Sequence, residues 1–352
     1  MKFSLNKNEE KKLIALFDQH EKNLDYLIYL ARVFNDRPIL IDKKNYDFTN
    51  KSDFEIKKIL FANLEKLYKF DNDYIKKNII WDTQLLKSED YLSNPYLATF
   101  KNVTFKKQGW TFANVKRPAY TLCPYQEEYP YGGNYALKMG IACFDNDYIY
   151  PSISLYDQEW MSLNQHEIRT MEVPISLARG KVLTLGLGLG YFAFMASNKE
   201  DVKEVHIVEM DVELIKLFNE YLLPLFPHKE KIHIHKADAY HFINSVNDND
   251  YDYIFSDLWH DVSDGLPSYI KLKSVFSKFS KTICTYWIEE SILSYLQLII
   301  IGIMKDEYYK NENEYDELQV FIKNKLASYS LNNSADIDSL LSNQGLNNIL
   351  FI

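Results

Sequence analysis

Hydrophobic residues recur at helical spacing through the first part of the chain. In residues 7–34 and 53–79, apolar positions repeat every three or four residues between Lys and Glu, which places them on one face of a helix. We therefore expect a helical N-terminal region over residues 1–97. Over residues 98–177 the pattern changes to short runs rich in Tyr, Phe, Thr and Val with turn residues between them, which predicts a small antiparallel β region.

Strands and helices alternate from residue 181 onward. The apolar runs VLTLG, VHIVE, KIHIHKA, YDYIFSD and TICTYW are each followed by a segment with helical spacing. Such alternation requires crossover helices and a parallel sheet with both faces covered. We expect an α/β fold with a doubly wound, mainly parallel, Rossmann-like sheet over residues 178–304. Residues 305–352 follow as a mostly polar, helical C-terminal extension, and its apolar end, NNILFI, is either a last strand or a docked terminus.

The first of these strands ends in alternating glycines, KVLTLGLGLGY. Gly186, Gly188 and Gly190 let the backbone approach a ligand, and the helix N-terminus that follows favours negative charge. The dinucleotide fingerprint G-x-G-x-x-G/A needs a small sixth residue, but this chain has Tyr191 there, which disfavours an NAD-dependent oxidoreductase. The form G-x-G-x-G is usual in enzymes that bind S-adenosylmethionine. A tight turn without any ligand is the alternative.

Acidic residues follow the next two strands. Glu209 ends the second strand, where it is placed to accept hydrogen bonds from ribose hydroxyls. Asp238 follows the third strand and precedes the small Ala239. Its carboxylate either accepts a hydrogen bond from an adenine amine or caps the next helix, since aspartate is a preferred N-cap residue.

The fourth strand ends in SDLWHD, which brings Asp257, Trp259, His260 and Asp261 together. Carboxylates near a histidine raise its pKa and position it as a proton acceptor. We expect His260 to be the catalytic base, oriented by Asp257 or Asp261. Trp259 either covers the cofactor or substrate or simply packs.

These residues carry a family resemblance. Residues 148–300 resemble the spermidine synthase branch of the class I S-adenosylmethionine-dependent methyltransferase superfamily. In that branch a hairpin with a Y-x-E ending precedes the glycine strand, and SLYDQEWMSLNQHE is similar, with Gln165 at the tyrosine position. The resemblance implies that Gln165 and His166 face the substrate. It also implies a cofactor site formed by Gly186, Gly188, Gly190, Glu209, Asp238, Ala239 and Asp257, and a possible homodimer.

The chain departs from this branch after the fourth strand. Polyamine synthases carry D-x-x-D-P there, whereas this chain has His260 in place of the second aspartate and Asp261 in place of the proline. A charge-assisted hydrogen bond contributes about 1.5–3 kcal/mol, so a diamine should bind less well. We therefore favour methyl transfer from S-adenosylmethionine to a small or medium-sized acceptor. Aminopropyl transfer from decarboxylated S-adenosylmethionine is the first alternative, and a non-catalytic nucleotide-binding assembly module is the second.

Composition narrows the range of partners. The net charge of −9 over 352 residues argues against broad binding to nucleic acid or anionic membranes, which require a basic face. Three widely spaced cysteines form neither a disulfide framework nor a metal cluster, and the charged N-terminus does not resemble an export signal. We expect a soluble cytoplasmic enzyme with a small-molecule substrate.

Five histidines, His206, His228, His233, His235 and His241, cluster in the sequence. His233 and His235 lie on one face of a predicted strand, and the others stand at spacings unrelated to metal motifs. We therefore expect no metal site.

Overall fold

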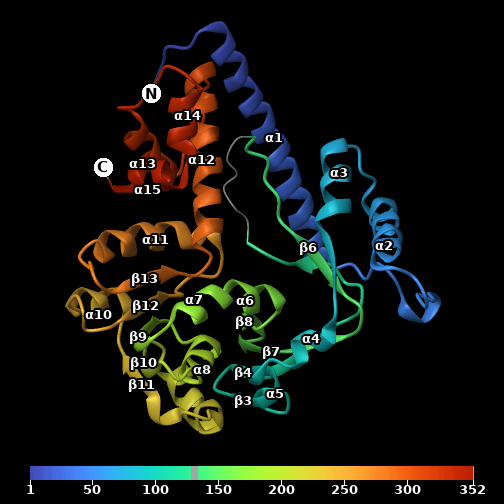
Figure 1. Ribbon diagram of the computed structural model, residues 1–352, viewed down its shortest axis with the longest axis vertical. Helices are drawn as coiled ribbons and strands as arrows, with labels where there is room; N and C mark the ends of the chain where they lie inside the picture. The colour runs from blue at the N-terminus through green and yellow to red at the C-terminus, as the bar shows by residue number, and fades with distance from the viewer. Residues whose placement is uncertain (128–133, 352) are drawn as a thin grey trace.

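The core of the molecule is a five-stranded parallel sheet. The structure, a computed structural model, describes residues 1–127 and 134–351 (Figure 1). The strands lie in the order β11-β10-β9-β12-β13, and each pair is parallel. The order reverses between β9 and β12, the point where ligands bind in open α/β sheets. The strands are β9 (Gly180–Leu185), β10 (Val202–Glu209), β11 (Ile232–Lys236), β12 (Tyr253–Ser256) and β13 (Ile283–Tyr286).

A helix follows each strand, as the sequence pattern predicted. The last four residues of β9 and all four of β12 are buried, which happens when helices cover both faces of a parallel sheet. The predicted Rossmann-like α/β fold is confirmed. The helices are α8 (Tyr191–Ser197), α9 (Val212–Leu217), α10 (Ala239–Ser245), α11 (Val262–Phe276) and α12 (Glu289–Tyr309), with a π-helical turn at Phe218–Leu222 and 3-10 turns at Leu223–Leu225 and Lys229–Lys231.

The expected β region is present and contains two sheets. The larger one is antiparallel, in the order β3-β4-β7-β8, formed by β3 (Phe105–Lys107), β4 (Trp110–Arg117), β7 (Tyr148–Leu155) and β8 (Gln158–Ser162). The smaller one has the order β2-β6-β5, with β2 (Thr83–Leu86), β5 (Cys123–Pro124) and β6 (Ile141–Phe144). In it β2 and β6 pair in parallel, so one strand comes from the region expected to be wholly helical.

Apart from β2 and a two-residue strand at its start, the N-terminal region is helical. The segment expected as one helix over residues 53–79 forms two, because Lys69 adopts a left-handed backbone conformation with φ 48° that ends the first. The helices are α1 (Lys7–Asp36), α2 (Asp53–Tyr68), α3 (Asp73–Asp82), α4 (Ser88–Leu92) and α5 (Pro95–Phe100), with a 3-10 turn at Lys43–Asn45. Two further helices, α6 (Gln165–Thr170) and α7 (Glu172–Leu177), lead into the parallel sheet.

The two ends of the chain come together. Strand β1 (Lys2–Phe3) pairs in parallel with β14 (Ser330–Leu331), and α1 runs beside α12 (Figure 1). The C-terminal extension adds α13 (Glu317–Leu326), α14 (Ser334–Leu341) and α15 (Asn343–Phe351). The apolar end NNILFI is therefore a docked helix with Leu346 and Ile349 fully buried, not a strand; Ile352 lies outside the described residues.

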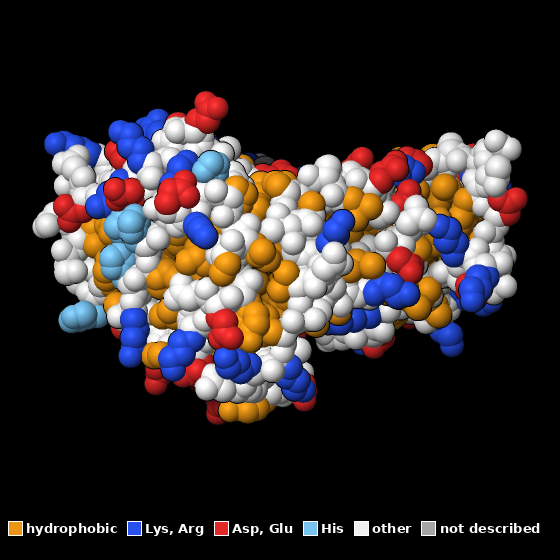
Figure 2. Space-filling view, turned by 90° about the horizontal axis from the view of Figure 1, so that it is seen from below, with side chains coloured by type: hydrophobic (Ala, Val, Ile, Leu, Met, Phe, Trp, Pro, Cys, Tyr) orange, Lys and Arg blue, Asp and Glu red, His pale blue; other side chains and the backbone are white. Residues whose placement is uncertain are grey.

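The surface is mixed in charge on the face that Figure 2 shows. Lysine and arginine side chains are interspersed there with aspartate and glutamate, and histidines gather at the end of the molecule where β10, β11 and α10 lie in Figure 1. Within the described residues, no helix combines the length and the apolar character needed to cross a bilayer.

Candidate active site

A cavity of about 950 Å³ opens at the carboxyl ends of β9, β10, β11 and β12. This volume is at the upper end of the range found for small-molecule sites. The hairpin strand β8 and the start of α6 close it from the other side. Gly188, Glu209 and Asp238, which are far apart in the sequence, all line this one cavity.

The glycine turn forms the floor of the cavity at its first two glycines. Gly186 has φ 100°, and a Cβ added there would lie 2.1 Å from the carbonyl oxygen of Asp257. Gly188 has φ 50°, and its Cβ would lie 2.5 Å from Met161 Sδ. Any side chain would therefore be strained at both positions and would overlap the Asp257 carbonyl or the Met161 side chain. Gly190 does not line the cavity; it is the N-cap of α8 and faces a core phenylalanine ring.

Glu209 is held rigidly at the tip of β10. Its Oε1 accepts hydrogen bonds from the backbone N–H groups of Met210 at 2.7 Å and Asp211 at 2.8 Å, and its Oε2 accepts one from Leu187 at 3.2 Å. A carboxylate has about four lone-pair positions. One therefore stays free for a ligand in this conformation, and a second ligand hydroxyl would have to replace one of the backbone bonds.

Asp238 serves as a helix cap and lines the cavity as well. Its Oδ1 accepts a hydrogen bond from His241 N at 2.8 Å as the N-cap of α10. In the described part of the chain, its Oδ2 accepts no hydrogen bond, so this oxygen remains able to bind a ligand. The small Ala239 lies beside it on the cavity wall.

Two carboxyl groups in the cavity have strongly perturbed acidity. Burial raises the pKa of Asp257 to about 7, and His260 partly opposes this shift. Burial also raises the pKa of Glu167 well above its ordinary value, with further contributions from the negative charges of Asp257 and Glu159. Glu159 accepts a hydrogen bond from Ser162 Oγ at 3.2 Å. Raised carboxyl pKa values in a cleft are typical of functional sites.

The charged side chains on the cavity wall are almost all acidic. Among the described residues that line it there is no lysine or arginine, and His260 is its one basic side chain. The acids on its wall are Glu159, Glu167, Glu209, Asp211, Glu213, Asp238 and Asp257.

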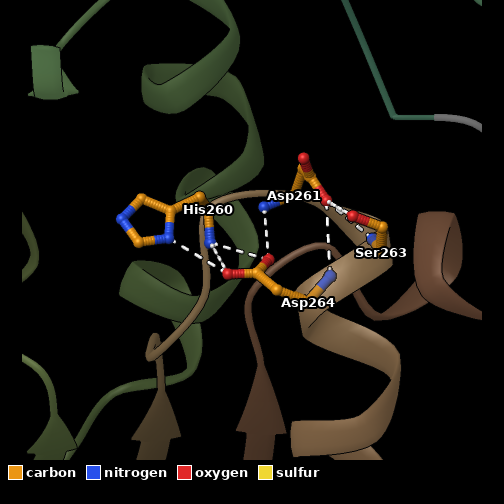
Figure 3. A network of polar contacts seen from close by, with 4 residues as sticks. All are labelled: His260, Asp261, Ser263 and Asp264. Carbon is orange, nitrogen blue, oxygen red and sulfur yellow. Dashed lines mark hydrogen bonds and ion pairs between the residues drawn. The ribbon is translucent and has the colours of Figure 1, made fainter. Parts of the chain in front are cut away.

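His260 stands at the mouth of the cavity in a network that Figure 3 shows. Its Nδ1 lies 3.0 Å from Asp264 Oδ2, and its backbone N–H donates to both oxygens of that carboxylate at 3.1 Å. Asp261 instead caps α11 and accepts hydrogen bonds from Ser263 N at 2.7 Å and Ser263 Oγ at 2.6 Å. The expectation that Asp257 or Asp261 orients His260 is wrong, because Asp264, one helical turn further along, has taken that position.

The two hairpin residues expected to face the substrate do not line the cavity. Gln165 is fully buried, and its Nε2 donates to the Pro124 carbonyl. His166 lies in a buried environment that lowers its pKa to about 4, with a contribution from Arg169. Asn164 and Glu167 line the cavity in their place, since residues three apart share one face of a helix.

Three indole rings complete the wall. Trp259 is buried and contacts Gly265, and its Nε1 has no hydrogen-bond acceptor within the described residues. Trp287 donates from Nε1 to Thr170 Oγ1 at 2.9 Å. Trp160, which is nearly half exposed, meets the His260 ring edge-on with centroids 5.1 Å apart. Sequence reasoning missed Trp160 and Trp287. The position of Trp287 directly after β13 was a possible signal, whereas Trp160 lies within β8 and carried none.

Neither a protein-family model nor a curated protein sequence matches the chain. Several solved structures are similar to part of the chain. Spermidine synthase from Thermotoga maritima is 14% identical, with 43% of this chain and 55% of that chain covered and a TM-score of 0.32. A spermidine synthase in complex with the transition state analogue AdoDATO is 17% identical, covers 34% of this chain and 44% of its own, and has a TM-score of 0.27.

A third similar structure is a conserved hypothetical protein from Streptococcus pyogenes, 14% identical over 31% of this chain and 68% of that chain, with a TM-score of 0.25. The chain thus spans about half of the two synthases that it matches. These likenesses concern the fold alone, and the strand order of the chain itself shows that fold to be Rossmann-like. What the site does has to be argued from its own geometry.

Proposed function

We propose that the protein is a transferase that moves an alkyl group from an adenosyl sulfonium compound to a cationic amine. The observation that carries this proposal is the charge of the cavity: seven carboxyl groups and, among its described lining residues, no lysine or arginine. Burial favours the neutral forms of Asp257 and Glu167, and a cationic ligand in the cavity would favour their charged forms. A sulfonium donor and an ammonium acceptor are both such cations.

The residues present fit the adenosyl part of such a donor. Gly186 and Gly188 line the cavity with backbone alone, so no side chain of theirs stands between the turn and a ligand. Glu209 and Asp238 each keep an oxygen able to accept a ligand hydrogen bond, as a ribose hydroxyl and an adenine amine require. The donor itself supplies an alkyl group on a positively charged sulfur, which a nucleophile can displace.

Asp257 is the residue best placed to handle the proton of the amine. An ammonium group must lose a proton before its nitrogen can act as a nucleophile, and a proton acceptor works best when its pKa is near the working pH. Asp257, with a pKa of about 7, meets that condition, and Glu167 beside it can hold the positive charge. His260, paired with Asp264 at the mouth, is placed to guide the acceptor in rather than to deprotonate it.

Two donors remain candidates, each favoured by a different observation. S-adenosylmethionine, and hence methyl transfer, is favoured by His260 at the position where polyamine synthases carry a second aspartate. Decarboxylated S-adenosylmethionine, and hence aminopropyl transfer, is favoured by the acidic wall, because the carboxylate of S-adenosylmethionine would find no lysine or arginine among the described lining residues.

The experiment that tests the proposal offers each donor to the purified protein together with a panel of monoamines, diamines and triamines. Mass spectrometry then distinguishes the by-products, S-adenosylhomocysteine for methyl transfer and methylthioadenosine for aminopropyl transfer. Asp257→Asn, which removes the proton acceptor and keeps the side-chain shape, should abolish turnover while donor binding persists. Binding of either donor without turnover of any amine would contradict the proposal and support a non-catalytic nucleotide-binding module.

A further inference from the structure

A cluster of histidines outside the cavity is brought together by strand pairing. His206 on β10 and His233 on β11 are register partners in the parallel sheet. Side chains on one face of a strand recur every two residues, so Glu204 joins His206 and His235 joins His233. Glu204, His206 and His233 each offer a ligand atom, and these atoms all lie within 4.8 Å of one another.

We propose that Glu204, His206 and His233 form a binding site for a divalent transition-metal ion of the zinc type. Two imidazoles and one carboxylate are a donor set that zinc accepts, with an open position left for water. Tetrahedral ligands at about 2.0–2.1 Å from the ion stand roughly 3.3 Å apart. His206 Nε2 and Glu204 Oε2 are already 3.0 Å apart, so only the exposed His233 ring has to move closer.

His235 contacts the ring nitrogen of His206 that would not bind the ion. Its Nε2 lies 2.8 Å from His206 Nδ1, and the two rings are stacked with centroids 5.0 Å apart. Either nitrogen of this pair can be the donor. His206 can therefore keep its proton on Nδ1, directed at His235, while Nε2 gives up its proton and binds the ion. Metal-ligating histidines usually donate their other ring N–H to a hydrogen-bond acceptor, and His235 Nε2 would be that acceptor here.

Lys181 is the competitor at this site. Lys181 lies on β9, the strand beside β10, and is the register partner of Glu204. Its Nζ lies 3.9 Å from Glu204 Oε2. The pair is solvent-exposed, with both side chains more than 40% accessible, so an ion can displace the ammonium group at little cost. Replacing Lys181 by Gln should accordingly tighten metal binding.

The test is a calorimetric titration of the metal-stripped full-length protein with zinc chloride. We expect one ion per chain, with protons released on binding because the ligands must be deprotonated. His233→Gln should weaken the affinity by at least about tenfold, and His235→Ala by roughly 10–100-fold, as loss of an orienting partner does. Cobalt should give the absorption bands of a tetrahedral site in the wild type and lose them in His233→Gln.

The matched control is His228→Gln. His228 is also an exposed histidine beside a carboxylate, with Nδ1 3.3 Å from Glu230 Oε1, but it is not part of a three-ligand set within the described residues. Its replacement should leave zinc affinity unchanged. His233 is exposed, so His233→Gln should fold, which circular dichroism would verify. Equal zinc binding by the wild type and His233→Gln, or no binding by the wild type at about 0.1 mM zinc, would overturn the assignment.

Discussion

Glu209 provides the sharpest test of the cofactor site, because the structure specifies what each substitution would break. Glu209→Ala removes the one lone-pair position that faces the cavity and the three backbone bonds that hold the carboxylate in place. Glu209→Gln keeps the size of the side chain. Its NH2 group, however, must face either Leu187 N–H or the two N–H groups of Met210 and Asp211. In both orientations one hydrogen-bond donor therefore faces another.

The magnitudes follow from the number and exposure of these bonds. A hydrogen bond to a charged group contributes about 1.5–3 kcal/mol, so losing the ligand contact should weaken donor binding by roughly 10- to 150-fold. Met210 is 68% exposed, and water can replace the carboxylate there. Leu187 is buried, at 6% exposure, and its unpaired N–H should cost about 1–3 kcal/mol of folding free energy.

The assay is calorimetric titration with S-adenosylmethionine and with S-adenosylhomocysteine, alongside urea unfolding of each variant. Glu220→Gln is the control, since it removes one negative charge from an exposed residue that pairs with Lys107 outside the cavity. It should bind both ligands as the wild type does. An unchanged dissociation constant in folded Glu209→Ala would refute the ribose contact, whatever the effect on stability.

Three further predictions concern the same site. Burial raises the pKa of Asp257 from 3.8 to about 7, so between these pH values the folded protein holds a proton there that the unfolded chain loses. This contribution to stability is complete below about pH 4 and is lost as the pH rises through 7. Urea unfolding at several pH values should therefore show Asp257→Asn gaining up to about 4 kcal/mol relative to the wild type between those limits. Gly186→Ala should destabilise more than Gly188→Ala, because its Cβ would meet a backbone carbonyl instead of the flexible Met161 side chain, and Met161→Ala should rescue binding in the Gly188 variant alone. Asp264→Ala removes one half of the capping box of α11, the bond from Asp261 N–H to the Asp264 carboxylate, and leaves the Asp261 N-cap in place. It should cost about 1 kcal/mol of unfolding free energy, whereas equal stability of this variant and the wild type would contradict the capping geometry.

The fold was predictable wherever local patterns specify it. Alternating apolar runs and helical segments were enough to identify the five parallel strands and the helices between them, because strand burial on both faces gives continuous apolar runs. Tertiary pairing could not be read in the same way. The parallel β2–β6 pair and the β1–β14 pair join residues more than 50 positions apart, and neither leaves a periodic signal in the sequence.

Site residues that directly follow a strand were predictable from the sequence. Those on a helix were less so, because the direction of their side chains depends on where the helix begins. Glu209, Asp238 and Asp257 follow strands, so the topology alone brings them to one edge of the sheet. Gln165 and Glu167 differ by only two positions in the first turn of α6, and the direction of each side chain depends on where that helix begins. The Asn164 N-cap sets that start, and it turns Gln165 into the core and Glu167 toward the cavity.

Strand register explains why the histidine cluster could not be recognised from spacing. Within β10 alone the proposed set has two ligands, Glu204 and His206, and within β11 it has one, His233; only the pairing of His206 with His233 brings the three together. Along β10, Glu209 lies three residues beyond His206, about 10 Å further along the strand. Because side chains alternate along a strand, the two point to opposite faces of the sheet. An ion at Glu204 and His206 would therefore share no ligand with the cavity. The ion would affect the cavity only indirectly, by holding β11, which Asp238 follows, against β10.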